Sequence, residues 1–111
     1  MIMTQYVKTH EEFTNEVLNF DGVALVDFYA DRCGPCRMLG PIVEELAQVY
    51  EGNNAVKIIK VDVDSNPDTA SAYSVMSIPT VLIFKGGEMK HQDVGVQMKE
   101  VYENKINALA G

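Results

Sequence analysis

The 111-residue sequence is short of cations, cysteine and tryptophan. It has 9 Lys and Arg against 16 Asp and Glu, a formal net charge of −7, with 2 Cys and no Trp. The shortage of cations argues against binding to nucleic acid or to an anionic membrane, since both need clustered positive charge. No apolar run approaches the roughly 18 residues of a membrane-spanning helix. Two cysteines are also too few for a disulfide-rich secreted scaffold.

The sequence also lacks linkers, internal repeats and a recognisable targeting segment. Its first residues have neither the basic flank nor the apolar stretch of a signal peptide, so we expect a cytoplasmic protein. The hydrophobic fraction of 47% is high enough for a folded core, and the length suits one domain. We therefore expect residues 1–111 to form a single domain that acts as a monomer.

Strand and helix patterns alternate along the first half of the chain. Residues 6–7 resemble a short edge strand, and Thr9 with Glu12 has the spacing of a capping box that opens a helix ended by Asp21-Gly22. The almost continuous apolar run 23–30 predicts a central strand covered on both faces. A second helix, with Pro41 inside it, follows the cysteines. The apolar faces of the two helices are predicted from the following residues: Phe13, Val17 and Phe20, then Leu39, Ile42, Val43, Leu46 and Tyr50.

The second half predicts three more strands and two more helices. Residues 56–63 form a second central strand, and Asn66-Pro67 is a typical start for a short helix. Strands 80–84 and 89–94 are joined by Gly86-Gly87, a hairpin turn signal. Strands that alternate with helices imply a mainly parallel sheet, to which the hairpin adds an antiparallel edge. The overall prediction is an α/β sandwich. Its closing helix should bury one stripe: Met98, Val101, Tyr102, Ile106 and Leu109.

The two cysteines stand in Cys33-Gly34-Pro35-Cys36, where a central strand ends and a helix begins. A helix N-terminus favours a thiolate, because its free N–H groups and positive dipole end stabilise negative charge. The carboxyl ends of strands in open α/β sheets are also where such folds place their sites. A thiolate with a neighbouring thiol can attack a disulfide and then be released by the second thiol. We therefore predict redox chemistry.

Two other interpretations of the cysteine pair compete with this one. As a structural staple, the short ring would contribute only about 2 kcal/mol, less than a longer loop would. As a zinc site, the pair supplies two ligands of the usual four, and His10 and His91 stand in distant segments with no paired spacing. Neither interpretation explains the position of the motif as well as redox chemistry does.

Further motifs run nearly from end to end of the chain: Val26-Asp27-Phe28-Tyr29-Ala30, Cys33-Gly34-Pro35-Cys36, Pro41, Lys60-Val61-Asp62-Val63-Asp64, Asn66-Pro67, Ile78-Pro79-Thr80, Phe84-Lys85-Gly86-Gly87 and Val94-Gly95. Together they resemble the thioredoxin family. The resemblance implies a three-layer α/β/α sandwich, with a central mixed sheet of about five strands flanked by four helices. It also implies a protein-disulfide reductase without metal or bound cofactor. Thioredoxin reductase or an equivalent enzyme would restore its dithiol.

The resemblance assigns roles to the cysteines and to two charged residues. Reduced Cys33 would attack a target disulfide, and Cys36 would resolve the mixed disulfide. Asp27 is a carboxylate in an otherwise apolar strand, where burial without a partner is costly. The family's matching Asp lies beneath the second cysteine, so Asp27 would help to move the Cys36 proton, tuned by Lys60 on the adjacent strand. The alternative is a structural Asp27–Lys60 ion pair without a chemical role.

The resemblance also predicts how targets dock. Pro79 matches a cis-proline that faces the cysteines, although an ordinary trans proline at a strand start also fits the sequence. Gly34 and Pro35 would support the site. Exposed apolar residues often mark binding surfaces, although any one of these could instead belong to the core. The remaining residues of the docking rim are Tyr29, Met76, Ile78, Val94, Gly95 and Val96.

The chain departs from the family at Tyr29 and Arg32, which stand where thioredoxins usually carry Trp. Arg32 directly precedes Cys33, and a cation about 6 Å from the sulfur would favour the thiolate by about half a pKa unit. It also replaces apolar contact area, so we expect its larger effect on the choice of targets and of reductase. The rival hypothesis for the whole chain is a binding module whose partner uses the rim and ignores the cysteines.

Overall fold

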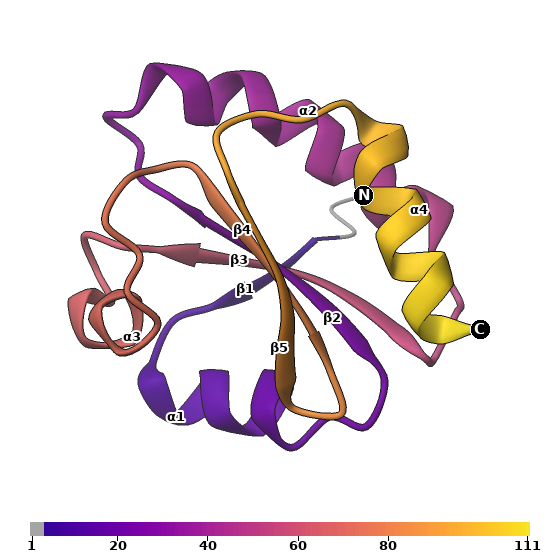
Figure 1. Ribbon diagram of the computed structural model, residues 1–111. Helices are drawn as coiled ribbons and strands as arrows, with labels where there is room; N and C mark the ends of the chain where they lie inside the picture. The colour runs from indigo at the N-terminus through magenta and orange to yellow at the C-terminus, as the bar shows by residue number, and fades with distance from the viewer. Residues whose placement is uncertain (1–3) are drawn as a thin grey trace.

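A computed structural model describes residues 4–111. Its middle layer is a five-stranded sheet in the order β1-β3-β2-β4-β5 (Figure 1). Helices α2 and α4 cover one face of the sheet, and α1 and α3 cover the other. This confirms the α/β/α sandwich. The strands are β1 (Gln5–Val7), β2 (Val23–Tyr29), β3 (Val56–Asp62), β4 (Thr80–Lys85) and β5 (Glu88–Val94), and the helices are α1 (His10–Phe13), α2 (Gly34–Val49), α3 (Pro67–Ala72) and α4 (Lys99–Ala110).

The sheet is more evenly mixed than the sequence pattern predicts. Strands β1, β3 and β2 run parallel, but β4 pairs with β2 in the antiparallel direction, and β5 is antiparallel to β4. The expected antiparallel hairpin at the edge is confirmed, but the expectation of a mainly parallel sheet is wrong at β4, which runs antiparallel to β2. Helix α3 explains the difference, because its 6 residues extend only about 9 Å. Such a short helix cannot carry the chain back to the end of the sheet where β3 begins. Strand β4 therefore starts near the end where β3 finishes.

Two apolar clusters lie on opposite faces of β2, as expected for a strand covered on both sides. Val23 and Leu25 pack with α2 and α4, whereas Ala24, Val26 and Phe28 pack with the elements of the α1–α3 face. Side chains alternate between the faces of a strand. Asp27 therefore lies on the face that α2 and α4 cover.

The helix starts follow the sequence signals with local differences. Thr9 caps α1 by accepting the Glu12 N–H at 3.0 Å, but the Glu12 carboxylate accepts the Lys8 N–H at 2.6 Å, one residue before the capping residue. The expected single helix is α-helical only through Phe13 and continues as a π-helical segment, η1 (Thr14–Leu18). Pro67 opens α3 as expected.

Two further details concern the end of the chain. Gly86 and Gly87 form the turn between β4 and β5 with φ of +60° and +80°, which confirms the hairpin. A side chain at Gly87 would also collide with the Leu18 carbonyl.

Tyr102 and Ile106 are fully buried, but Met98 precedes α4 and is 71% exposed, so its assignment to the buried stripe is wrong. Within residues 4–111, no helix is long and apolar enough to cross a membrane.

Candidate active site

The two cysteines form a disulfide at the start of α2, with 5.3 Å between their Cα atoms. Cys33 is the N-cap of α2, and its Sγ accepts the Cys36 backbone N–H at 3.2 Å. Both residues are largely buried. The two cysteines therefore differ in their electrostatic surroundings and not in their exposure. Among the described residues, the Cys33 sulfur alone accepts an N–H group from the first turn of the helix.

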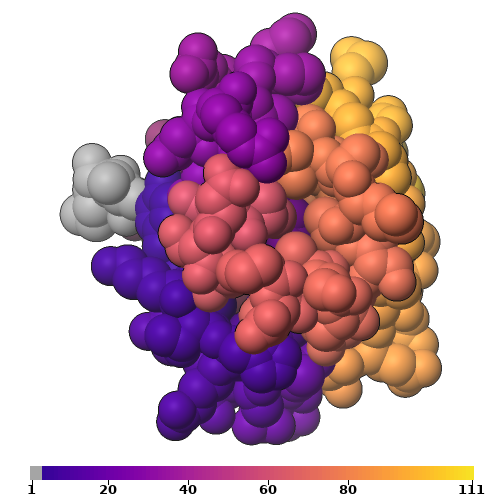
Figure 2. Space-filling model, turned by 90° about the vertical axis from the view of Figure 1, so that its left-hand side faces the viewer, coloured from indigo at the N-terminus to yellow at the C-terminus, as the bar shows by residue number. Residues whose placement is uncertain are grey.

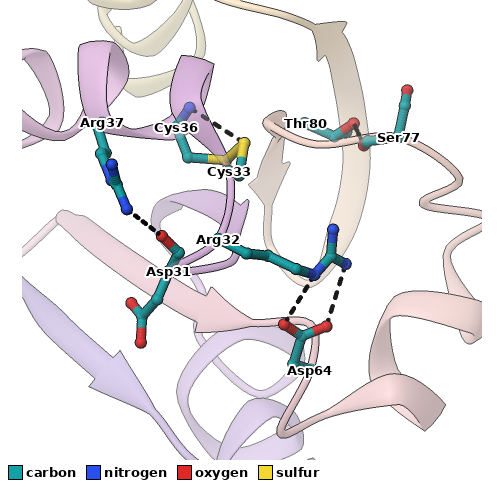
Figure 3. Close-up of a disulfide and its surroundings, with 8 residues drawn as sticks. All are labelled: Asp31, Arg32, Cys33, Cys36, Arg37, Asp64, Ser77 and Thr80. Atoms are coloured by element: carbon teal, nitrogen blue, oxygen red, sulfur yellow. Dashed lines mark hydrogen bonds and ion pairs between the residues drawn. A yellow bond between two sulfur atoms is a disulfide. The ribbon is translucent and has the colours of Figure 1, made fainter.

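Backbone contacts hold the loop that carries Cys33. The Cys33 N–H donates to the Ala30 carbonyl at 3.1 Å, and the Val63 N–H donates to the Tyr29 carbonyl at 2.9 Å. The Arg37 side chain reaches back from α2 to the Asp31 carbonyl at 3.1 Å (Figure 3). These bonds tie the loop to α2 and to the end of β3, so the disulfide sits on a fixed frame.

The segment that faces the disulfide comes from the start of β4. The Ile78–Pro79 peptide bond is cis, which confirms that part of the prediction for Pro79. The Pro79 carbonyl accepts the Gly95 N–H at 2.8 Å, so the loop after β5 lies against Pro79. The Thr80 hydroxyl donates to the Ser77 carbonyl at 2.6 Å, and Ile78 packs against the cysteines. The structure thus brings together three segments that are far apart in the sequence.

The residues expected to form the docking rim differ in exposure. Met76 is 94% and Val94 58% exposed, whereas Val96 packs partly against the core on the α2–α4 face. Gly34 and Pro35 are exposed beside the disulfide, and the other expected rim residues, Tyr29, Ile78 and Gly95, are half-buried.

A groove of about 580 Å³ lies next to this rim. Its lining comes from Arg32, from the segment between β3 and α3, from α3 itself, and from the residues before β4. These segments meet on one face of the molecule in Figure 2, with the region at the start of α2 at the top, the β3–α3 region in the centre and the segment before β4 to its right. Val63 and Ile78, which line the groove, also pack against the apolar cluster that contains the two cysteines.

Arg32 is directed away from the disulfide (Figure 3). Its guanidinium donates two hydrogen bonds to Asp64, at 3.1 and 3.2 Å, and this contact raises the pKa of Arg32. Asp64 neutralises the cation, so the direct effect that we expected on the Cys33 thiolate is smaller. Asp64 is a residue of the site that the sequence motifs do not assign a role. The sequence does contain a signal for the Arg32–Asp64 contact. Arg32 follows β2 and Asp64 follows β3, and the carboxyl ends of parallel strands lie at the same end of a sheet.

Asp27 is a buried carboxyl without a hydrogen-bond partner. It is 1% exposed, and within residues 4–111 no donor reaches either of its side-chain oxygens. Burial raises its pKa to about 7, because the charged form is disfavoured in an apolar surrounding, and the charge of Lys60 opposes this shift. A carboxyl with such a pKa can take up or release a proton near neutral pH.

Lys60 stands opposite Asp27 in the register of β2 and β3, as expected. The ion pair of the alternative interpretation is missing, since no ion pair among the described residues involves Lys60. The ammonium instead lies 4.4 Å from the ring centroid of Tyr29 and 5.6 Å from that of Tyr6. Lys60 thus acts on Asp27 through its field, not through a contact.

No group of three or more His, Cys, Asp or Glu residues within 4–111 is placed to hold a metal ion.

Known proteins resemble this chain along most of its length. The sequence model of the thioredoxin family matches residues 4–108. Thioredoxin 2 of Chlorobaculum tepidum is 50% identical over 103 residues, which cover 93% of each chain. Thioredoxin 1 of a Nostoc species is 50% identical over 91 residues, covering 82% of this chain and 83% of its own. A mutant thioredoxin from Halobacterium salinarum superposes with a TM-score of 0.85 at 38% identity, over 99% of this chain and 94% of its own.

Proposed function

Since this chain belongs to the thioredoxin family and is a protein-disulfide reductase, a thiol–disulfide oxidoreductase, we propose that Cys33 is its nucleophile and Cys36 its resolving thiol. The Cys33 thiolate attacks one sulfur of a target disulfide, forms a mixed disulfide and releases the other target sulfur as a thiolate. Cys36, as a thiolate, then attacks the Cys33 sulfur. The target leaves as a dithiol, and two electrons have passed to it as the Cys33–Cys36 disulfide forms.

One observation carries this division of roles: the Cys36 N–H donates to the Cys33 sulfur at the N-terminus of α2. When the pair is reduced, the same contact and the helix dipole stabilise negative charge on Cys33. Cys33 therefore carries more thiolate than Cys36, and the thiolate is the form of a cysteine that attacks a disulfide.

Asp27 is proposed to accept the proton of Cys36, which must be removed before Cys36 can attack. A general base works best when its pKa lies near the working pH, and the pKa of Asp27 is raised to about 7. Lys60 tunes this carboxyl. Residues 1–111 are proposed to act as one domain, because both apolar clusters share one sheet.

The family implies two kinds of partner, namely target proteins that contain disulfides and a reductase that restores the dithiol. We propose that this chain works as a monomer, that thioredoxin reductase or an equivalent enzyme recharges it, and that it acts in the cytoplasm, where such thiols are kept reduced. Targets are proposed to dock through Gly34 and Pro35, against Pro79 and the rim formed by Tyr29, Met76, Ile78, Val94, Gly95 and Val96, with Arg32 at the edge of the groove. Binding requires no further cofactor in this scheme.

Insulin reduction driven by dithiothreitol tests the assignment. Cys33→Ser and Cys36→Ser should both lose turnover, but only Cys36→Ser should accumulate a mixed disulfide with a target, because it attacks and cannot resolve. Equal turnover in wild type and both variants would support a binding module instead.

Alkylation provides a second test of the same roles. Limiting iodoacetamide should label Cys33 of the reduced protein first, because Cys33 carries more thiolate. Peptide mapping that finds Cys36 labelled faster would reverse the assignment.

A further inference from the structure

Lys60 belongs to a row of side chains that crosses the sheet. In the strand register Tyr6 of β1 stands opposite Lys60 of β3, and Lys60 stands opposite Asp27 of β2. Tyr29 lies two residues further along β2 on the same face. The rings of Tyr6 and Tyr29 meet edge to face with 6.4 Å between centroids, and the Lys60 ammonium lies within cation–π distance of both. The ammonium is thus held by two aromatic rings.

An alternative place for the ammonium lies close by. A pocket of about 160 Å³ is lined by Lys60 together with Cys36, Arg37 and Asp31. A lysine side chain is long and flexible and is strongly hydrated at its tip. If one aromatic ring were removed, the ammonium could move into this pocket, where water would solvate it and screen its charge from Asp27.

We propose that Tyr6 is a positioning residue, which together with Tyr29 holds the Lys60 ammonium over the sheet face that carries Asp27. The inference deepens the proposed function, since its consequence for turnover rests on Asp27 as the proton acceptor of Cys36. Tyr6 stands on the edge strand and is 42% exposed, and it reaches this region through the Lys60 ammonium and the Tyr29 ring.

Several ionisable groups face this region and define the measurement. Lys60 approaches Asp27 from β3, Cys36 belongs to α2, and Tyr102 of α4 feels the charge of Asp27. Asp31 and Asp62 act on Tyr29, whose pKa is raised to about 12, chiefly by burial. Val81 of β4, opposite Asp27, is apolar. In the oxidised protein the cysteines do not titrate. Near pH 7, Asp27 is then the group in this row that changes charge.

The test is the pKa of the Asp27 carboxyl in the oxidised protein, followed through its carboxyl carbon by NMR. Tyr6→Leu removes the aromatic ring, and we expect an Asp27 pKa roughly 0.5 higher, as for the loss of one screened charge nearby. Tyr6→Phe keeps the ring and should leave the pKa of Asp27 at its wild-type value. Lys60→Met should raise it at least as much as Tyr6→Leu does. Adding Tyr6→Leu to Lys60→Met should raise it no further.

Three results would overturn the proposal: an unchanged or lowered pKa in Tyr6→Leu, a pKa in Tyr6→Phe that follows Tyr6→Leu, or an equal rise when Lys60 is already Met. Tyr6→Ile serves as a second apolar variant if Tyr6→Leu does not fold. The proposed function fails separately. If Asp27→Asn turned over normally while the pKa shifts followed the expected pattern, Tyr6 would position Lys60 but Asp27 would not be the base.

Discussion

Two acidic residues on the sheet face beneath α2 and α4, Asp27 and Asp93, have opposite surroundings. Asp27 and Asp93 flank Val81 in the strand register. Asp93 accepts two hydrogen bonds of 2.8 Å from the Lys105 ammonium, whereas Asp27 has no hydrogen-bond partner among the described residues. The negative charge of Asp93 is thus balanced by Lys105 of α4. The charge of Asp27 is balanced only at a distance, by Lys60.

The difference between the two carboxyls shows that Asp27 is the one whose burial lowers the stability of the folded protein. Asp93 is half-buried on the edge strand and is paired with a cation from α4, whereas Asp27 is 1% exposed on a central strand and has no hydrogen-bond partner among the described residues. Asp27 lies on the same side of the sheet as α2, whose first turn carries Cys36. Groups with perturbed pKa values concentrate at functional sites. The comparison therefore separates Asp93, whose carboxylate is paired, from Asp27, which we propose to act in proton transfer.

The largest expected effect is on the stability of Asp27→Ala. The unfolded carboxyl has a pKa of 3.8 and the folded one about 7, so the folded state holds a proton that the unfolded state releases. The wild type therefore loses stability as pH rises from about 4 to 7, by at most about 4 kcal/mol for this group alone. Asp27→Ala removes this penalty. In urea unfolding of the oxidised protein, we expect the variant to be more stable than wild type by up to that amount at pH 8.

The pH dependence provides the control for this prediction. The gain should vanish near pH 4, where the folded state no longer carries the charge and only the small cavity of the Ala variant remains. A gain of the same size at pH 4 and pH 8 would mean that the ionisation of Asp27 is not its source.

Asp93→Ala should change stability in the other direction. It leaves the Lys105 ammonium, 29% exposed in its pair, without a partner. We expect a loss of about 1–2 kcal/mol at pH 8, between the values typical of exposed and of buried pairs. Urea unfolding measures it beside Asp27→Ala. If both variants were stabilised, the contrast between the two carboxyls would not hold.

The smallest expected effect concerns the exposed pair beside Cys33. Because Asp64 neutralises Arg32, Arg32→Trp should leave the Cys33 thiol pKa nearly unchanged. Asp64→Asn removes the neutralising charge and should lower the pKa by about 0.5 at low salt, with less effect at high salt. Thiolate absorbance of the reduced protein measures both. A clear rise in Arg32→Trp would show that the free cation acts on Cys33 after all.

Residues that break a pattern could be identified from the sequence. Asp27 is recognisable as the one charge in an apolar strand, and the cysteines stand where a strand pattern gives way to a helical one. Helical spacing likewise identifies Tyr102 and Ile106 as core, and both are fully buried. These signals depend only on residues that are close together in the sequence, so they can be recognised without knowledge of the fold.

Features that depend on the meeting of distant segments could not be found in this way. The Arg32–Asp64 pair joins residues 32 positions apart, and the position of Lys60 between two rings depends on the order of the strands. The direction of β4 follows from the length of α3, which the pattern alone does not fix. Met98 fits the helical stripe by spacing but lies just before the first turn of α4, where it stays largely exposed.

The central claim, that Asp27 is left uncompensated for proton transfer whereas Asp93 is structural, is tested most directly by turnover of the two amide variants. Insulin reduction at pH 7 should fall about 10- to 100-fold in Asp27→Asn, because Cys36 loses its base. It should stay within about twofold of wild type in Asp93→Asn, assayed at a temperature where both proteins are folded. Wild-type turnover in Asp27→Asn, or an equal loss in both variants, would contradict this claim.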